Sequence, residues 1–306
     1  MDSEQLRALR NNVTISGTLA ELEVKEGTNK NGIPYISLKG AIRFGESGAE
    51  SRRFRTYVQA QNASGNDNKQ YTAIKQWVDG AVSEADNKEL ATMVTIVGSL
   101  EANDYINPAG ELVESVEINA KFFNDYRELE DGNAIVDLEG YIKAITDEVK
   151  NDVETGRKRV TMVSTDFFRN AVVVKNIIVP KELAEDFVDM FEVGDTALLF
   201  LTYMLHKGER KEVKAGGLGK QRVVEGRDYV ELVVTGAPPA NQQGEPIEKK
   251  ILKILMEERT QKLEDLKEEG YQGSNTDTTP TAKKTTSKKG AKKVTVDDID
   301  DDDIPF

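Results

Sequence analysis

From residue 11 to about residue 126, apolar and polar side chains alternate in short runs, a pattern typical of β-strands. The alternation is clearest over residues 35–44 and 52–59. Ile74, Trp77 and Val78 instead follow a helical spacing, and an Asn-Pro-Ala-Gly turn signal occupies residues 107–110. We therefore expect strands over residues 13–19, 35–44, 52–59, 93–100 and 112–123, with a helix over residues 71–85.

Three strands, a helix and two further strands is the element order of an OB-fold, a five-stranded barrel that binds oligonucleotides. The second half of the chain follows the same plan, since residues 134–145 resemble residues 13–22 and Gly140 is placed as Gly17 is. The alternative is one OB domain followed by an unrelated α+β domain. The repeat predicts strands over residues 134–145, 157–165, 171–178, 197–205 and 229–235, with a helix over residues 180–191.

An apolar stripe with charges on the opposite face predicts an amphipathic helix over residues 247–269. Docking on the core of the same chain is the first interpretation of its stripe, and a dimerisation helix, hence a homodimer, is the alternative. The fold class predicted is thus mainly β with helices: two tandem OB-fold-like barrels, a C-terminal amphipathic helix and a disordered tail.

Charge is distributed unevenly along the tail. Residues 281–293 carry six lysines and no acid, and residues 297–306 carry six aspartates and no base. A tail so poor in apolar side chains favours disorder. The expected organisation is an OB-fold DNA-binding domain over residues 1–130, a second OB-like domain over 131–240, the C-terminal segment with its helix over 241–269, a basic linker over 270–296 and an acidic tip over 297–306.

Basic and aromatic side chains share one face of the two clearest strands. Because side chains alternate across a strand, Ile36, Leu38 and Phe54 face inward while the opposite parity faces out. Cations follow phosphates and rings stack on bases, which suits a single strand. An ordinary solvated sheet face is the alternative. The candidate single-stranded-DNA contacts in the first domain are Tyr35, Lys39, Arg43, Arg53, Arg55 and Tyr57, joined by Tyr105 near the hairpin tip.

The candidates for DNA contact in the second domain are Arg157, Lys158, Arg159, Phe167, Phe168 and Arg169, and Arg157 and Arg159 are the two predicted as contacts. Phe167 and Phe168 would point to opposite faces of an extended strand, so at least one is expected in the core. The loop over residues 207–228 is rich in Gly, Lys and Arg and could close over a strand. Its KAGGLGK sequence lacks the spacing of a phosphate-binding P-loop.

Composition argues against several classes of function. The chain of 306 residues has no Cys and one His, His206, so thiolate metal sites and His-based triads are not expected. The acidic residues do not form a spaced motif of the kind that indicates a metal-dependent enzyme. We therefore expect no enzymatic activity and no cofactor. No apolar run reaches the length of a membrane span, so we expect a cytoplasmic protein without a membrane partner. A net charge of −13 confines any DNA site to a local basic region.

The chain ends in an acidic run followed by Ile304, Pro305 and Phe306. This end is very similar to the acidic tip of bacterial single-stranded DNA-binding proteins, which commonly ends in Asp-Asp-Ile-Pro-Phe. The resemblance covers about ten residues. It implies DNA binding by an OB-fold and recruitment of replication, recombination and repair enzymes by the tip. The partner-binding residues it implies are Asp300, Asp301, Asp302, Asp303, Ile304, Pro305 and Phe306.

The strand pattern and the resemblance of the acidic tip together predict a protein that coats single-stranded DNA without sequence preference and recruits partner enzymes. The bacterial family has one OB domain and assembles as a tetramer, whereas two OB-like units in one chain favour a lower oligomer. That departure suggests a phage or mobile-element version, acting in a bacterial cell or a phage-infected host. The alternative is an acidic interaction or DNA-mimic protein that has no affinity for single strands.

Overall fold

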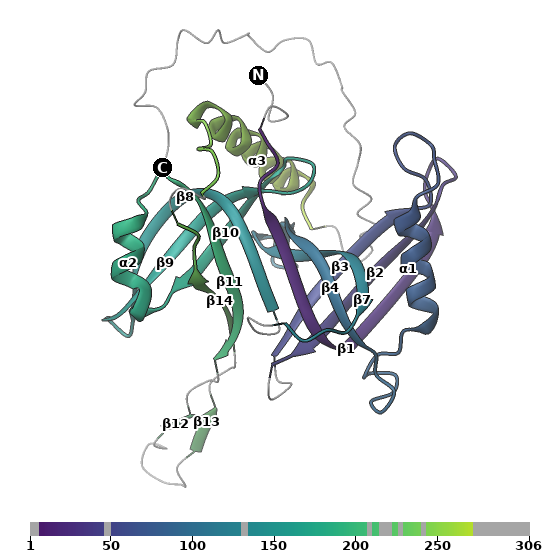
Figure 1. The fold of residues 1–306 in the computed structure, drawn as a ribbon, viewed down its shortest axis with the longest axis horizontal. Helices are drawn as coiled ribbons and strands as arrows, with labels where there is room; N and C mark the ends of the chain where they lie inside the picture. The colour runs from purple at the N-terminus through teal and green to yellow at the C-terminus, as the bar shows by residue number, and fades with distance from the viewer. Residues whose placement is uncertain are drawn as a thin grey trace.

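The computed structural model describes residues 6–45, 50–129, 134–206, 229–239 and 243–271, together with the backbone of residues 210–213 and 222–225. In these ranges the chain forms two rings of strands that lie side by side (Figure 1). Helices α1 and α2 lie at opposite ends of the molecule, and α3 lies across the junction of the two rings. The predicted class, mainly β with helices, is confirmed.

Five strands close the first barrel. β1 pairs antiparallel with β2 and β4, β3 pairs antiparallel with β2, and β7 joins β4 antiparallel to β3 parallel, so no edge is left open. Helix α1 (Lys69–Gly80) lies between the third and fourth strands and is capped by the side chain of Asn68. This is the order predicted for an OB-fold. The strands are β1 (Asn11–Thr28), β2 (Pro34–Phe44), β3 (Glu50–Gln59), β4 (Met93–Ala102) and β7 (Val116–Asp125).

The second ring repeats these pairings. β8 pairs antiparallel with β9 and β11, β10 pairs antiparallel with β9, and β14 joins β11 antiparallel to β10 parallel. The short helices η2 (Lys181–Leu183) and α2 (Ala184–Met190) lie between its third and fourth strands, as α1 does in the first barrel. Its strands are β8 (Ala134–Lys150), β9 (Val153–Thr165), β10 (Ala171–Val179), β11 (Thr196–His206) and β14 (Tyr229–Gly236).

Gly17 and Gly140 occupy equivalent positions in the two rings. Gly17 lies on β1 where that strand passes from β4 to β2, and Gly140 lies on β8 where that strand passes from β11 to β9. A Cβ at Gly17 would lie 2.1 Å from the carbonyl oxygen of Arg43, and a Cβ at Gly140 would lie 2.6 Å from that of Val163. Both positions exclude a side chain for the same reason, which supports the internal repeat.

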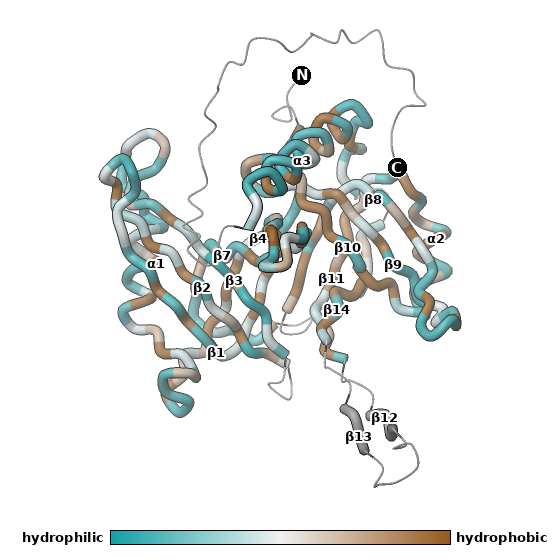
Figure 2. The backbone as a smooth tube through the Cα atoms, turned by 180° about the vertical axis from the view of Figure 1, so that it is seen from behind, coloured by the Kyte–Doolittle hydropathy of each residue, from teal (hydrophilic) through white to brown (hydrophobic). Residues whose placement is uncertain are grey.

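The two rings are joined through their first strands. β1 pairs with β8 from Asn11 opposite Leu138 to Ile15 opposite Ala134, which makes one continuous ten-stranded sheet. The buried side chain of Asn11 donates to the carbonyls of Leu100 (2.9 Å) and Thr165 (3.0 Å), one in each ring. Both interiors belong to one apolar core. In Figure 2 the strands around the junction of the two rings are mostly brown, that is hydrophobic, whereas β2 and β3 mix teal and brown.

Helix α3 (Lys249–Glu269) docks on the same chain. Ile251 and Leu255 pack against Val163 and Val173 in a second apolar cluster on the outer surface of β9 and β10. The first interpretation of the amphipathic stripe is therefore confirmed. The basic linker and the acidic tip, residues 270–306, lie outside the described residues except for their first two positions.

Several predicted elements differ in their bounds: β1, β8 and β9 are longer than predicted, and two other differences have a clear physical reason. Helix α1 ends at Gly80 rather than at residue 85, because the next segment runs along β1, where the amides of Glu84 and Ala85 donate to the carbonyls of Leu19 and Ala20. The strand expected over residues 112–123 is interrupted, because β5 (Tyr105–Ile106) and β6 (Leu112–Val113) form a separate hairpin before β7 begins. In the segment between residues 206 and 229, β12 (Arg210–Val213) pairs with β13 (Arg222–Glu225).

Candidate nucleic-acid interface

The predicted orientation of β2 and β3 is confirmed by burial. Ile36, Leu38 and Phe54 are buried inside the first barrel, while side chains of the opposite parity reach the outer surface. The register places Lys39 opposite Arg55 and Ser37 opposite Tyr57. We call this outer surface the β2–β3 face. It carries six of the predicted contact residues: Tyr35, Lys39, Arg43, Arg53, Arg55 and Tyr57.

Two tyrosines form an aromatic pair on the β2–β3 face. The rings of Tyr35 and Tyr57 lie with their centroids 5.2 Å apart at an interplanar angle of 32°. Both side chains are half-buried, and the side-chain amide of Gln59 donates to the Tyr57 hydroxyl at 3.4 Å. The pair therefore presents a preformed ring surface, which lowers the entropy that a stacking base would have to overcome.

The four cations of this face differ in their surroundings. Arg43 is paired with Glu84 (3.2 Å), and Arg55 lies 3.8 Å from Glu101 and 3.6 Å from Glu117. Arg55 also donates to the side chain of Asn103. Lys39 and Arg53 are exposed and make no hydrogen bond or ion pair to another described residue. These two are the cations best placed to meet a phosphate.

Glu117 lies on β7 among the cations of the β2–β3 face. Burial raises the pKa of its carboxyl above the usual range, and the opposing effect of Arg55, Lys39 and Arg53 does not cancel that increase. The neighbouring carboxylate of Glu101, on β4, adds to the increase. Burial thus makes the negative charge of Glu117 costly in free energy. As the pH falls, Glu117 takes up a proton at a higher pH than an ordinary glutamate does.

Glu117→Gln is therefore expected to raise affinity for a dT oligomer about two- to fivefold at neutral pH, because one like charge near the phosphates is worth up to about 1 kcal/mol. Wild-type affinity should rise as the pH falls through the raised pKa of Glu117, and the variant should lack that part of the rise. Fluorescence anisotropy across weakly acidic pH measures both, and thymine bases do not titrate there. Identical pH profiles would show that Glu117 does not face the DNA.

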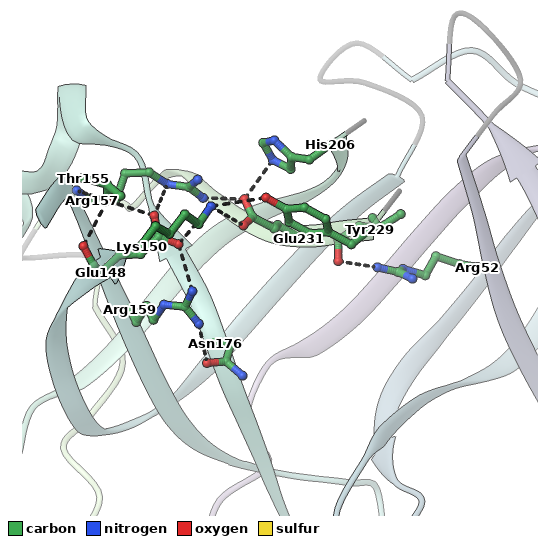
Figure 3. A network of polar contacts seen from close by, with 11 residues as sticks. Arg52, Glu148, Lys150, Thr155, Arg157, Arg159, Asn176, His206, Tyr229 and Glu231 are labelled. Atoms are coloured by element: carbon green, nitrogen blue, oxygen red, sulfur yellow. Dashed lines mark hydrogen bonds and ion pairs between the residues drawn. The ribbon is translucent and has the colours of Figure 1, made fainter. Parts of the chain in front are cut away.

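Arg157 and Arg159, the predicted contacts in the second ring, are engaged with carboxylates (Figure 3). Glu148, fully buried, lies 3.5 Å from Arg157 and 3.0 Å from Arg159. Arg157 also pairs with Glu231. Burial by itself raises the pKa of Glu148, but the Thr155 hydroxyl and the surrounding cations outweigh it, and that pKa is lowered. The two arginines thus hold the end of the second ring together, and their contact with DNA stays a prediction.

Arg52, which the sequence pattern did not single out, crosses from the first barrel to the second ring. Its guanidinium donates to the carbonyl of Val230 (3.1 Å) and lies 4.5 Å from the ring centre of Tyr203. Burial lowers the pKa of Arg52. Only the three-dimensional pairing could have identified it, because Arg52 has the inward parity of a core position and is followed directly by the outward Arg53.

The second ring does not present a face equivalent to the β2–β3 face. Helix α3 covers the outer surface of β9 and β10, where Val163 and Val173 are buried beneath Ile251 and Leu255. Arg259 extends this cover to the first barrel, since it pairs with Asp104 (2.9 Å) and Glu114 (3.1 Å) beside the β5–β6 hairpin. A nucleic acid on the β2–β3 face would therefore not continue onto β9 and β10 in the same manner.

Tyr105 lies on β5 and is 46% exposed, and the residue before it, Asp104, is paired with Arg259. It is reachable by a ligand, and its role as a base-stacking residue stays a prediction. The side chains of the loop over residues 207–228 and the tip residues from Asp300 to Phe306 lie outside the described part of the structure.

The expectation that Phe167 or Phe168 would be in the core is wrong. The two side chains are 73% and 71% exposed. Strand β9 ends at Thr165 and β10 begins at Ala171, so both residues belong to the turn between them and are not subject to strand alternation. The Phe167 ring centre lies 5.4 Å from Nζ of Lys121 on β7. The sequence signal for this exposure was that both phenylalanines fall between the strands predicted over residues 157–165 and 171–178.

Within the described ranges, no group of three or more His, Asp and Glu side chains is arranged to hold a metal ion. None of the described helices is long and apolar enough to cross a bilayer.

The closed ring β1–β2–β3–β7–β4, with a helix between its third and fourth strands, defines a protein of the OB-barrel class. The chain belongs to the YorF family, whose model matches residues 10–269 and so spans both rings and α3. No curated protein matches the chain.

Among solved structures, the chain is similar to the wild-type single-stranded DNA binding protein from Thermus aquaticus. The two are 16% identical with a TM-score of 0.45, over 80% of this chain and 99% of that chain. A deletion mutant of the Thermus aquaticus protein is 17% identical with a TM-score of 0.45, over 79% of this chain and 100% of that chain.

Proposed function

We propose that this protein binds single-stranded DNA, without sequence preference, along the β2–β3 face of its first barrel. The observation that carries the proposal is the Tyr35–Tyr57 ring pair beside the exposed cations Lys39 and Arg53. Rings stack on any base, and cations neutralise phosphates at any sequence, so the pair and its cations suit a single strand of any composition. The outer face of the second and third strands is also where an OB-fold usually binds oligonucleotides.

The mixed charge of the β2–β3 face limits the expected affinity and sets its salt dependence. Arg43 and Arg55 are paired with carboxylates, so a phosphate would have to compete for them. Lys39 and Arg53 are the two cations that would release counterions outright. With about 0.7 units of slope in log affinity against log salt for each phosphate that is neutralised on a single strand, two contacts predict a slope near −1.4, shallower than that of a strongly basic binder.

The test is a fluorescence-anisotropy titration of a labelled dT oligomer of about 16 nucleotides, with a duplex of equal length as control, at two salt concentrations. Salt-sensitive binding to the single strand alone is the expected result. Absence of binding to either would contradict the proposal. The function would then be that of an acidic interaction or DNA-mimic protein, with the acidic body as its binding surface. The carboxylates beside Arg43 and Arg55 would be the first residues to test by mutation.

We further propose that the acidic tip recruits replication, recombination and repair enzymes, in the cytoplasm of a bacterial cell or a phage-infected host. The support is the residue match over Asp302–Phe306 and the physics of the segment. The aspartates supply long-range attraction to a basic surface, and Ile304, Pro305 and Phe306 form a compact apolar group that can fill a small pocket beside it. A peptide of the last ten residues should retain host helicases or nucleases from a lysate, and a peptide without Phe306 should not. Equal retention by both would refute a specific tip.

A binding role requires no catalytic group, and we propose that the protein is not an enzyme. The carboxylates beside the β2–β3 face support this view, because Glu101 on β4 and Glu117 on β7 are engaged by Arg55. Glu148 of the second ring is likewise enclosed by cations rather than open to a ligand. Incubation of labelled single-stranded DNA with the protein and Mg²⁺ should leave the strand intact.

A further inference from the structure

We propose that Phe167 and Phe168 form a second base-stacking site, through which the second ring holds unpaired nucleobases of a strand that leaves the β2–β3 face. The inference rests on the proposed function and adds the contribution of the second ring. That contribution comes from the turn between β9 and β10, because α3 covers the strands themselves.

Exposure is the first observation. Phe167 and Phe168 are 73% and 71% exposed, and their rings meet edge to face with centroids 5.4 Å apart. A phenylalanine that is buried gains about 1.5–3 kcal/mol over one left in water, so two adjacent exposed rings forgo a substantial stabilisation. Contiguous exposed apolar surface of this kind can mark a binding site, and these two rings touch each other rather than lying singly.

The turn that carries the two rings is held in place by polar contacts. Asp166 and Asn170 close it, because the amide of Asp166 donates to the Asn170 carbonyl (3.0 Å) and the amide of Asn170 donates to the Asp166 carboxylate (2.8 Å). Arg169 has a φ of 61° and donates to the carbonyl of Leu6, and Lys262 of α3 donates to Asn170. The rings are therefore presented outward by a fixed backbone, although little packs on them.

Position relative to the β2–β3 face is the second observation. Strands β2, β3 and β7 are neighbours in the sheet, and the Thr56 hydroxyl donates to the Ala120 carbonyl (2.5 Å). The residues that follow this pair are Tyr57 on β3 and Lys121 on β7, so Lys121 lies one strand beyond the tyrosine pair. Lys121 Nζ in turn lies 5.4 Å from the ring centre of Phe167, and β10 lies beside β7.

A row of two ring pairs with one cation between them thus crosses the two halves of the molecule: Tyr35 and Tyr57, then Lys121, then Phe167 and Phe168. Two strand spacings of about 4.8 Å and the final cation–ring contact give the row a length of roughly 15 Å, so it spans several nucleotides rather than one. Lys121 provides a cation for the phosphate between bases on either side, and Phe167 provides the next ring. This chemistry fits unpaired bases on a continuous backbone, and a duplex would not expose the base faces that the rings need.

The experiment compares a short dT oligomer of about 6 nucleotides with a long one of about 16 on the full chain. Phe167→Ala combined with Phe168→Ala should weaken binding of the long oligomer about fivefold or more, the loss of at least one stacked base, and should weaken binding of the short oligomer as well, because the row is short enough for either oligomer to span. Leu90→Ala, which removes a side chain that is 68% exposed in another loop, is the matched control and should leave both affinities unchanged.

Phe167→Trp gives a direct readout of stacking. The emission of this tryptophan should be quenched when the long oligomer is added, whereas the native Trp77, stacked on Phe123 at 4.2 Å, should change little. If the wild type binds the long oligomer but the alanine pair changes nothing and the new tryptophan is not quenched, this inference is overturned and the proposed function stands. If the wild type binds neither oligomer, both fail.

Discussion

Replacing Tyr35 and Tyr57 together with alanine is expected to weaken binding of a long dT oligomer by about 30-fold or more. Each ring that stacks on a base contributes about 1–3 kcal/mol, and a factor of ten in affinity corresponds to about 1.4 kcal/mol. The two rings already lie 5.2 Å apart, so little conformational entropy is lost when bases join them. Anisotropy titration at fixed salt measures the loss.

Replacing both tyrosines with phenylalanine is the matched control, because it keeps the rings and removes only the hydroxyls. That variant should bind within about twofold of the wild type, since the Tyr57 hydroxyl takes part in one long hydrogen bond of 3.4 Å. Equal losses in the alanine and phenylalanine variants would assign the effect to the hydroxyls. Wild-type affinity in the alanine variant, with its fold intact by circular dichroism, would remove the β2–β3 face from consideration.

Arg259→Met is expected to lower the free energy of unfolding by about 3 kcal/mol. Arg259 is 6% exposed and pairs with Asp104 and Glu114, and removing one partner of a buried ion pair leaves an uncompensated charge, which costs about 3–5 kcal/mol. The lower end applies because Glu114 is partly exposed. Methionine keeps much of the buried volume, so the loss reports the charge. Urea denaturation followed by circular dichroism measures it.

The pH dependence of this loss has a definite sign. Burial alone raises the pKa of Glu114, but hydrogen bonds from Lys175 and Arg259 and their charges leave that pKa lowered. A lowered pKa in the folded state adds stability above the unfolded pKa, and that stability is lost as the pH falls through the folded pKa. The difference between the wild type and Arg259→Met should therefore shrink in acid.

Two further variants make the test of Arg259 specific. Lys250→Met, at an exposed position of the same helix, should change the free energy of unfolding by less than about 0.5 kcal/mol. Adding Asp104→Asn to Arg259→Met should restore part of the loss, because it removes the unpaired charge. Failure of that restoration would mean that Arg259 stabilises the fold through packing of its stem rather than through its ion pairs.

The sequence by itself determined which side chains of β2 and β3 point outward. Alternation along a strand is a local property with a period of two residues, so the grouping of Tyr35, Lys39, Arg53 and Tyr57 could be predicted without knowing what lies beside the strands. The amphipathic helix α3 was equally predictable from its spacing, as was the order of strands and helices of the first barrel.

Tertiary structure alone decided which of those outward groups are available. Arg43 and Arg55 meet Glu84, Glu101 and Glu117, which come from other parts of the chain, and no local pattern indicates such partners. The same holds for α3, whose apolar stripe predicted burial but not that it would cover β9 and β10. Phe167 and Phe168 are exposed because they lie in the turn between β9, which ends at Thr165, and β10, which begins at Ala171, so strand alternation does not apply to them. Local periodicity sets the direction of a side chain, whereas long-range register and docking set its surroundings.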